Sequence, residues 1–238
     1  MEVREQGSGI VLIGPPRGAS AIVRETAGQR VVPITLLLSE RPTVHSAYLR
    51  PFGRDTSQIR LRLPRDTPPG RYRGQAPLGG EQREVMVVVE PVLHVQLQPG
   101  SSAFTTGAGS SVVFAIGVTN AGNVAFDVPK SVAFDLDDSG DQERALGRTL
   151  RSGLEPGERR VDRLFEELRT GHGGEARVSL AAGAGPLAPG ESRELKCVLE
   201  IPTAVQAGRT YEGAWQLADA AHAVVITVQN GARSKEGS

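Results

Sequence analysis

An acidic run in the second half of the chain has the residue types of a calcium-binding loop. It extends from Asp135 to Glu143 and offers side-chain oxygens at loop positions 1, 3 and 5, with a glycine at position 6. Asp135, Asp137 and Ser139 fit these three positions, and the following Asp141 adds another carboxylate. Oxygen ligands suit Ca²⁺, and Asp135, Asp137 and Asp141 are the candidate metal ligands. Position 12, where such a loop carries a bidentate glutamate, is Leu146. The match is incomplete, and the sequence favours the alternative of a solvated acidic loop.

No other residues form a catalytic pattern in the sequence. The four histidines are scattered and show no zinc-enzyme spacing: His45, His94, His172 and His222. No serine lies in the Gly-x-Ser-x-Gly elbow of a hydrolase. The single cysteine, Cys197, alternates with Leu195 and Leu199, which predicts a buried, inert thiol on the inward face of a strand. The sequence therefore predicts a non-enzymatic protein with no cofactor, calcium being the one alternative.

The composition argues against two classes of partner. Lys+Arg and Asp+Glu are equal at 27 each, and aromatic residues make up 4% of the chain. Because it lacks net positive charge and stacking aromatics, we expect no nucleic-acid binding. Arginines between Arg50 and Arg73 are interpreted as solvent-facing strand positions that discourage edge-to-edge association, with an acidic partner as the alternative. No apolar run reaches the roughly 18 residues of a membrane span.

A segment that occurs twice indicates the architecture that must position these residues. Residues 59–74 contain an alternating strand, a proline, five further residues and a strand that begins Gly-Arg-Tyr. Residues 197–213 repeat this order, with Gly-Arg-Thr-Tyr at the start of the second strand. A hydrophobic strand follows each copy. The repeat predicts an all-β chain of two related β-sandwiches, at residues 1–90 and 91–230, with a boundary at Glu90-Pro91. The polar tail, residues 231–238, is predicted to be disordered.

The second sandwich carries an insertion at about residues 127–190. Its early strand, Val112–Thr119, is aligned with Val31–Leu38 of the first sandwich. Within the insertion, residues 158–171 show the i, i+3, i+4, i+7 spacing of an amphipathic helix, with the apolar stripe Val161, Leu164, Phe165 and Leu168. We expect this stripe to pack on the flank of the sandwich; binding a partner protein is the alternative.

Two motifs of the second half resemble those of a known family. Residues 118–124 end a strand in an Asn-Ala-Gly-Asn turn, and residues 187–191 contain a Pro-Gly-Glu turn before the next strand. This order resembles bacterial immunoglobulin-like domains of the kind found in cell-adhesion and envelope proteins. The resemblance implies two immunoglobulin-like β-sandwiches in tandem, the second with an inserted amphipathic helix. It also implies a role in binding without indicating a particular ligand.

The function predicted from the sequence is a non-enzymatic binding or structural module with a protein or glycan partner, at the cell envelope. Trp215 shares strand parity with Tyr211 and Leu217, which favours core packing over a carbohydrate-stacking platform. One alternative is a two-domain, chaperone-like assembly factor that donates a strand such as Val85–Val89 to a client. Another is a calcium-binding accessory domain of a larger enzyme complex. We expect an extracytoplasmic location if a signal peptide was removed, and a cytoplasmic one otherwise.

Overall fold

The structure is a computed structural model that describes residues 9–24, 30–38, 41–151, 153, 159–169 and 171–229. It divides into two compact units. Unit 1 comprises residues 1–94, 120–126 and 187–191, and unit 2 comprises residues 95–119, 127–186 and 192–238. Two short segments of the second half of the sequence thus belong to unit 1, and the predicted domain boundary at residue 90 stays a prediction. The tail at 231–238 lies outside the described residues.

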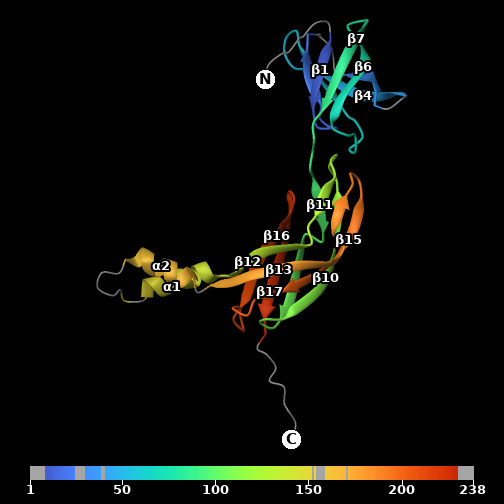
Figure 1. Ribbon diagram of the computed structural model, residues 1–238. Coiled ribbons are helices and arrows are strands. Elements are labelled where there is room, and N and C mark those ends of the chain that lie inside the picture. The colour runs from blue at the N-terminus through green and yellow to red at the C-terminus, as the bar shows by residue number, and fades with distance from the viewer. Residues whose placement is uncertain are drawn as a thin grey trace. The chain divides into compact units, whose positions relative to one another are not determined.

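Seven strands of unit 1 form one closed ring (Figure 1). Its order is β1-β2-β5-β4-β3-β6-β7, and β1 closes the ring by pairing in parallel with β7. In chain order this is the ABED and CFG arrangement of an immunoglobulin-like sandwich. The strands are β1 (Ile10–Gly14), β2 (Ser20–Val23), β3 (Arg30–Leu37), β4 (Pro42–Pro51), β5 (Ser57–Leu61), β6 (Gly70–Leu78) and β7 (Glu81–Val89).

Strand alternation builds the core of unit 1. In β3 every second residue from Val32 to Leu36 is buried, and β5 does the same with Ile59 and Leu61. In β7 the buried positions are Val85, Val87 and Val89. This strand already pairs with β6 on one side and β1 on the other. The alternative in which Val85–Val89 is donated to a client is therefore wrong, because the strand has no free edge.

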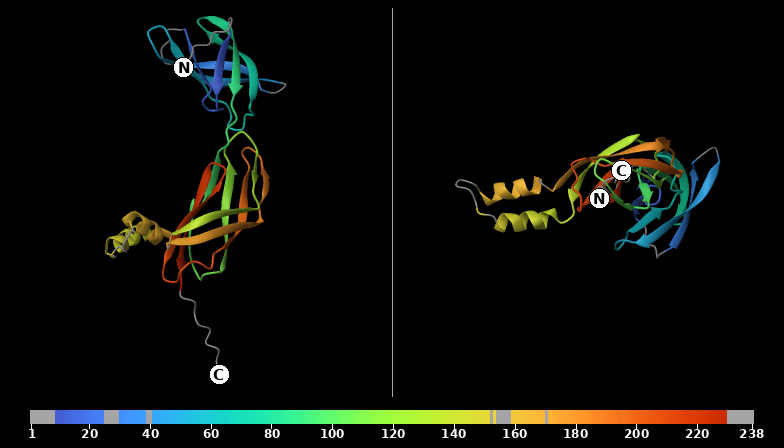
Figure 2. Two further views of the ribbon diagram at one scale, coloured as in Figure 1. Left: turned by 60° about the vertical axis from the view of Figure 1, so that its left-hand side comes forward. Right: turned by 90° about the horizontal axis from the view of Figure 1, so that it is seen from below.

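Unit 2 has the same strand order in an open sheet. Its strands are coloured from green to red in Figure 2. The order is β8-β10-β15-β13-β12-β16-β17-β9, in which β8 and β9 share the first-strand position at opposite ends. β11 and β14 form a separate two-stranded sheet. The strands are β8 (Val95–Gln98), β9 (Ser101–Thr106), β10 (Ser111–Asn120), β11 (Phe126–Val128), β12 (Ser131–Asp138), β13 (His172–Ala182), β14 (Gly185–Leu187), β15 (Ser192–Glu200), β16 (Thr210–Leu217) and β17 (Ala220–Val228).

The strand orders confirm the all-β, immunoglobulin-like fold and correct one alignment. The repeated segments contain β5 and β6 in unit 1 and β15 and β16 in unit 2, which occupy equivalent fifth and sixth positions. The alignment of Val112–Thr119 with Val31–Leu38 is wrong. The first segment lies in β10, a second strand, and the other lies in β3, a third strand. Both are alternating strands, so the sequence pattern alone could not separate them.

The insertion contains two helices where the sequence predicted one. The helices are α1 (Asp141–Arg151) and α2 (Arg160–Arg169), and they lie between the third strand, β12, and the fourth, β13. We call them together the helical arm. The run that predicted an acidic loop is β12 up to Asp138 and α1 from Asp141 onward. Acidic residues such as Asp141 and Glu143 favour a helix start, because the helix dipole is positive there. Among the described residues, neither helix has the length and apolar character needed to cross a membrane.

The Asn-Ala-Gly-Asn turn that carried the family resemblance is a buried hydrogen-bonded turn within unit 1. The Asn123 amide donates to the carbonyls of Thr67 and Glu90, each at 3.0 Å, and its oxygen accepts from the Val92 N–H at 2.6 Å. Asn120 is fully buried, and its oxygen accepts from the N–H of Gly122 at 3.0 Å. Because buried amides need such partners, this motif has a structural role.

Candidate functional site

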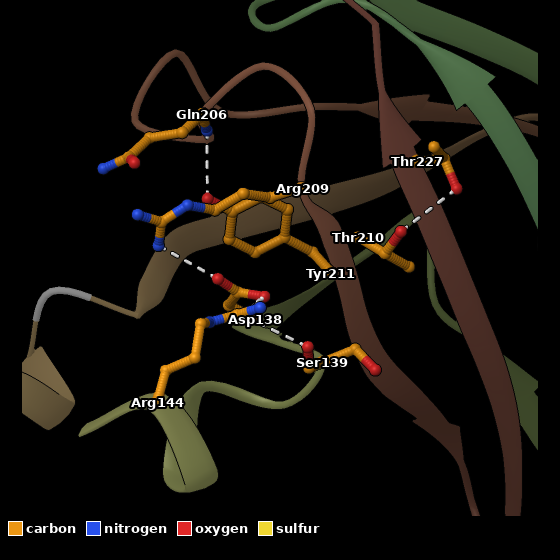
Figure 3. A network of polar contacts seen from close by, with 8 residues as sticks. All are labelled: Asp138, Ser139, Arg144, Gln206, Arg209, Thr210, Tyr211 and Thr227. Carbon is orange, nitrogen blue, oxygen red and sulfur yellow. Dashed lines mark hydrogen bonds and ion pairs between the residues drawn. The ribbon is translucent and has the colours of Figure 1, made fainter. Parts of the chain in front are cut away.

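A buried carboxylate anchors the helical arm to the sheet of unit 2. The side chain of Asp138, at the end of β12, is 1% exposed and pairs with two arginines (Figure 3). One oxygen accepts from Arg144 of α1, and the other accepts from Arg209, before β16, at 2.9 Å. The guanidinium of Arg144 also donates to the Ser139 carbonyl at 3.2 Å. Charge-assisted hydrogen bonds of this kind fix geometry, so α1 leaves the sheet in a defined direction.

Backbone and ring contacts extend this anchor. The N–H of Ser139 donates to the Thr210 carbonyl at 2.8 Å, which joins the start of the arm to β16. The buried Tyr211 accepts a hydrogen bond from the Gln206 N–H at 3.0 Å. A Cβ at Gly173 would lie 2.6 Å from Cδ1 of the Tyr211 ring. Only glycine fits there, so the ring of Tyr211 packs directly on the backbone at the start of β13, the strand that follows the arm.

The predicted calcium ligands do not surround one point. Asp135 and Asp137 lie on the exposed face of β12, near His172 of β13, whose nitrogens are 4.0 and 3.6 Å from their carboxylate oxygens. The side chain of Asp141 lies outside the described residues. Asp138, between them, has both oxygens engaged by arginine. Among the described residues there is no group of three or more His, Cys, Asp and Glu suited to a metal ion. Calcium binding stays a prediction.

The two helices of the arm pack on each other through small residues. Ala145 is fully buried and Thr149 is 3% exposed, and both lie on α1 four residues apart. Leu164 and Leu168, on α2, are half-buried. Figure 1 shows both helices beyond the ends of β12 and β13 and not against a face of the sheet. The expectation that the apolar stripe packs on the flank of the sandwich is therefore wrong.

Half of the predicted stripe is exposed instead. Val161 and Phe165 are 58% and 61% exposed, and on α1 Leu146 and Leu150 are 50% and 57% exposed. Leu146 directly follows the inward-facing Ala145, and Phe165 directly follows Leu164. When two helices pack antiparallel, the residue that follows an inward-facing residue lies on the same side of the helix pair in both helices. We call these four side chains, Leu146, Leu150, Val161 and Phe165, the apolar face of the arm.

The opposite side of the arm is held by ion pairs. Arg148 of α1 contacts Glu167 of α2 at 2.7 Å, and Arg163 contacts the same carboxylate at 3.1 Å. Arg148 and Glu167 each precede an inward-facing residue, Thr149 and Leu168, which places them away from the apolar face. The pair of helices is thus amphipathic. One side is apolar and exposed, and the other side carries charged residues that form ion pairs.

The remaining candidate residues belong to the core. Cys197 is fully buried, and burial raises the pKa of its thiol to about 11, which makes it a poor nucleophile at neutral pH. Trp215 is 2% exposed, as expected for core packing. His222 is fully buried beside it, at 5.5 Å between ring centroids, and its nitrogens lie 3.0 Å from the Pro99 carbonyl and from the Ser102 hydroxyl. These contacts are structural.

A pocket with polar and apolar lining lies in unit 2, where β8 meets β10 and β15. Its volume is about 680 Å³. Its lining includes Gln96, Gln98, Gly117, Thr119, Ser192 and Glu194. Thr119 and Ser192 share a hydrogen bond of 2.8 Å. Exposed amide and hydroxyl groups of this kind do not form a nucleophile and base pair.

Comparisons with known proteins yield no family. No protein-family model matches the chain, and no curated protein matches it. Solved structures with some likeness include a titin I-band fragment, with 10% identity, TM-score 0.32 and coverage of 95% of this chain and 63% of the other. The IG1+IG2 structure of DIP-gamma has 11% identity, TM-score 0.31 and coverage of 93% and 94%. The PapD-like domain 7 of human CEP192 has 13% identity, TM-score 0.28 and coverage of 61% and 95%. These similarities are weak, and the assignment of an immunoglobulin-like fold is based on the strand order.

Sequence reasoning found one side of the apolar face and missed the other. Of the four residues predicted as an alternative partner-binding stripe, Val161 and Phe165 are exposed, whereas Leu164 and Leu168 are half-buried. Leu146 was noted only as the wrong residue for a calcium loop. The i, i+4 pairs Ala145/Thr149 and Leu146/Leu150 are the signal that identifies α1 as a helix with two distinct sides.

Proposed function

We propose that the chain is a non-enzymatic binding module of the cell envelope, with two immunoglobulin-like sandwiches in tandem, and that its helical arm binds a partner protein. One observation carries the proposal: four large apolar side chains are about half exposed or more on one side of an arm that adds nothing to either sheet. Monomeric proteins rarely expose large contiguous apolar patches unless they use them. The Asp138 anchor supports the same role, because a fixed arm loses less entropy on binding.

Site-specific photo-crosslinking in the organism that encodes the protein tests this function. A benzoylphenylalanine at position 165, on the apolar face, should give a discrete adduct whose partner is identified by mass spectrometry. The same probe at position 163, on the charged side of the same helix, is the matched control and should give none. Leu150→Glu should abolish the adduct at position 165, because it places a charge on the shared face. Equal adducts at both positions, or no adduct at 165, would show that the arm binds no partner protein there.

A calcium-dependent role is a separate prediction about the exposed carboxylates of Asp135 and Asp137. Titration with Ca²⁺ and then EDTA should shift the melting temperature if these residues bind the ion, because a ligand that binds only the folded state stabilises it. Asp135→Asn combined with Asp137→Asn should remove the shift. An unchanged melting temperature in the wild type contradicts calcium binding.

A further inference from the structure

Free strand edges are distributed unequally between the two units. Each described strand of unit 1 has a neighbour on both sides in a closed ring, although β3 and β6 pair through two residue pairs only. The sheet of unit 2 is open, with β8 at one end and β9 at the other. At the first end, β8 covers β10 only in part, because β8 has four residues whereas β10 has ten. Part of β10 is therefore itself an edge.

The register of β10 shows which backbone groups point to that edge. The Ile201 N–H donates to the Ser110 carbonyl, and the Asn120 N–H donates to the Glu191 carbonyl, each at 2.9 Å. With the antiparallel register of β10 and β15, these bonds place the even-numbered residues of β10 in hydrogen-bonded pairs with β15. The odd-numbered residues, among them Val113 and Ala115, direct their N–H and C=O groups the other way.

The strand β8 covers only the C-terminal half of β10. A Cβ at Gly117 would lie 3.5 Å from the Gln98 carbonyl, so the last residue of β8 lies against Gly117. The chain then crosses to the opposite end of the same sheet. The Gly100 carbonyl accepts from the Ala223 N–H at 3.0 Å, and Ser101 pairs with Ala223 of β17. Residues 111–115 of β10 thus have a strand on one side only among the described elements.

The side chains on this edge do not guard it. Natural edge strands are commonly protected by charged residues, by proline or by a bulge. The outward residues here are Ser111, Val113 and Ala115, all exposed, and Val113 is 76% exposed. The other end of the sheet, β9, presents Ser101, Ala103 and Thr105 outward, none of which is a large apolar residue. The β10 edge therefore combines unpaired backbone groups with the larger apolar side chain.

We propose that a second copy of this chain occupies the edge, with residues 111–115 of the two copies pairing antiparallel about a two-fold axis at Val113. Ser111 of each copy then lies opposite Ala115 of the other, and Val113 lies opposite its own symmetry mate. All odd-numbered residues of the segment fall in hydrogen-bonded pairs. The paired segment stops before Gly117, which is already covered by Gln98, the last residue of β8 in the same copy.

The uncovered segment meets the requirement of a two-fold interface, in which one surface must fit itself. In the proposed register the two copies of Val113 form a β-branched cross-strand pair. Five residues per copy bury less surface than the roughly 800 Å² per partner that a stable interface buries. The dimer should therefore form and dissociate with concentration.

Analytical ultracentrifugation of the full chain from about 1 µM to about 1 mM tests the pairing, a range that spans weak association. The wild type should shift from monomer to dimer across the series. Val113→Pro should remain monomeric, because it removes a donor that points to the open edge and leaves the bonds to β15 intact. Val113→Lys should also remain monomeric. Val113→Thr, which keeps the backbone donor and the β-branch, is the matched control and should dimerise like the wild type.

Hydrogen exchange supplies a readout that does not depend on the variants. In the wild type the amides of Val113 and Ala115 should exchange at least several-fold more slowly at the high end of the series. A wild type that stays monomeric throughout would overturn the proposal, as would dimers that survive in Val113→Lys. Phe165→Asp, on the apolar face of the arm, should leave the dimer unchanged; if it abolishes the dimer, the copies meet through the arm and the edge proposal is wrong.

Discussion

Asp138 is the residue on which the position of the helical arm depends. We expect Asp138→Ala to lower the free energy of unfolding of unit 2 by about 2–3 kcal/mol. This is below the 3–5 kcal/mol for breaking a fully buried pair, because Arg144 and Arg209 are 46% and 26% exposed. Urea unfolding followed by circular dichroism measures the change. The neighbouring Asp137→Ala, at an exposed position, is the control and should change stability by less than about 0.5 kcal/mol. Equal losses in both variants would contradict the anchoring role.

Gly173 should tolerate no side chain. Its Cβ would lie 2.6 Å from the buried Tyr211 ring and 3.0 Å from the Leu136 carbonyl, so the strand and the ring must separate. We expect Gly173→Ala to destabilise the protein by about 1–3 kcal/mol, the usual cost of overpacking a core. Thermal unfolding compares it with Gly107→Ala, where nothing lies within 4 Å of the added carbon. An effect at Gly107 as large as that at Gly173 would be evidence against a steric cause.

The helical arm should be removable as an element. The Asp138 N–H donates to the Gly171 carbonyl at 3.0 Å, so the ends of β12 and β13 already meet. We expect replacement of residues 140–170 by a short Gly-Ser linker to leave the slowly exchanging amides of β12 and β13 in place, because neither helix covers the sheet. Hydrogen exchange measures this protection. Loss of protection throughout unit 2 would show that the arm is part of the fold.

Sequence patterns predicted the elements whose signal is local. Strand alternation gave the repeated β5/β6 and β15/β16 units and the buried position of Cys197. The 3.6-residue period gave α2. The helix α1 was missed because its first turn is acidic, and acidic residues favour both an exposed loop and a helix start. A stripe on one helix cannot show which of its residues face a second, unpredicted helix. The exposure of Val161 and Phe165 therefore required the structure.

At the scale of the whole molecule, His222 makes stability depend on pH. Burial lowers the pKa of this histidine, and its hydrogen bond to the Pro99 carbonyl offsets part of that shift. The neutral ring is therefore the folded form. Its contribution is complete above the unfolded pKa of about 6.5 and is lost as the pH falls through the lower folded value. Between pH 7 and pH 5, the free energy of unfolding should fall less in His222→Gln than in the wild type. Parallel pH profiles would contradict this.

The position of the single tryptophan has a spectroscopic consequence. Trp215 is buried in unit 2, while unit 1 contains two of the three tyrosines, Tyr48 and Tyr72. Indole emission excited at the red edge, where tyrosine does not absorb, should therefore follow the environment of unit 2 alone. Far-ultraviolet dichroism averages over the strands of both units. Denaturation recorded by both signals in one unlabelled sample would reveal whether the two units lose their structure together or one after the other.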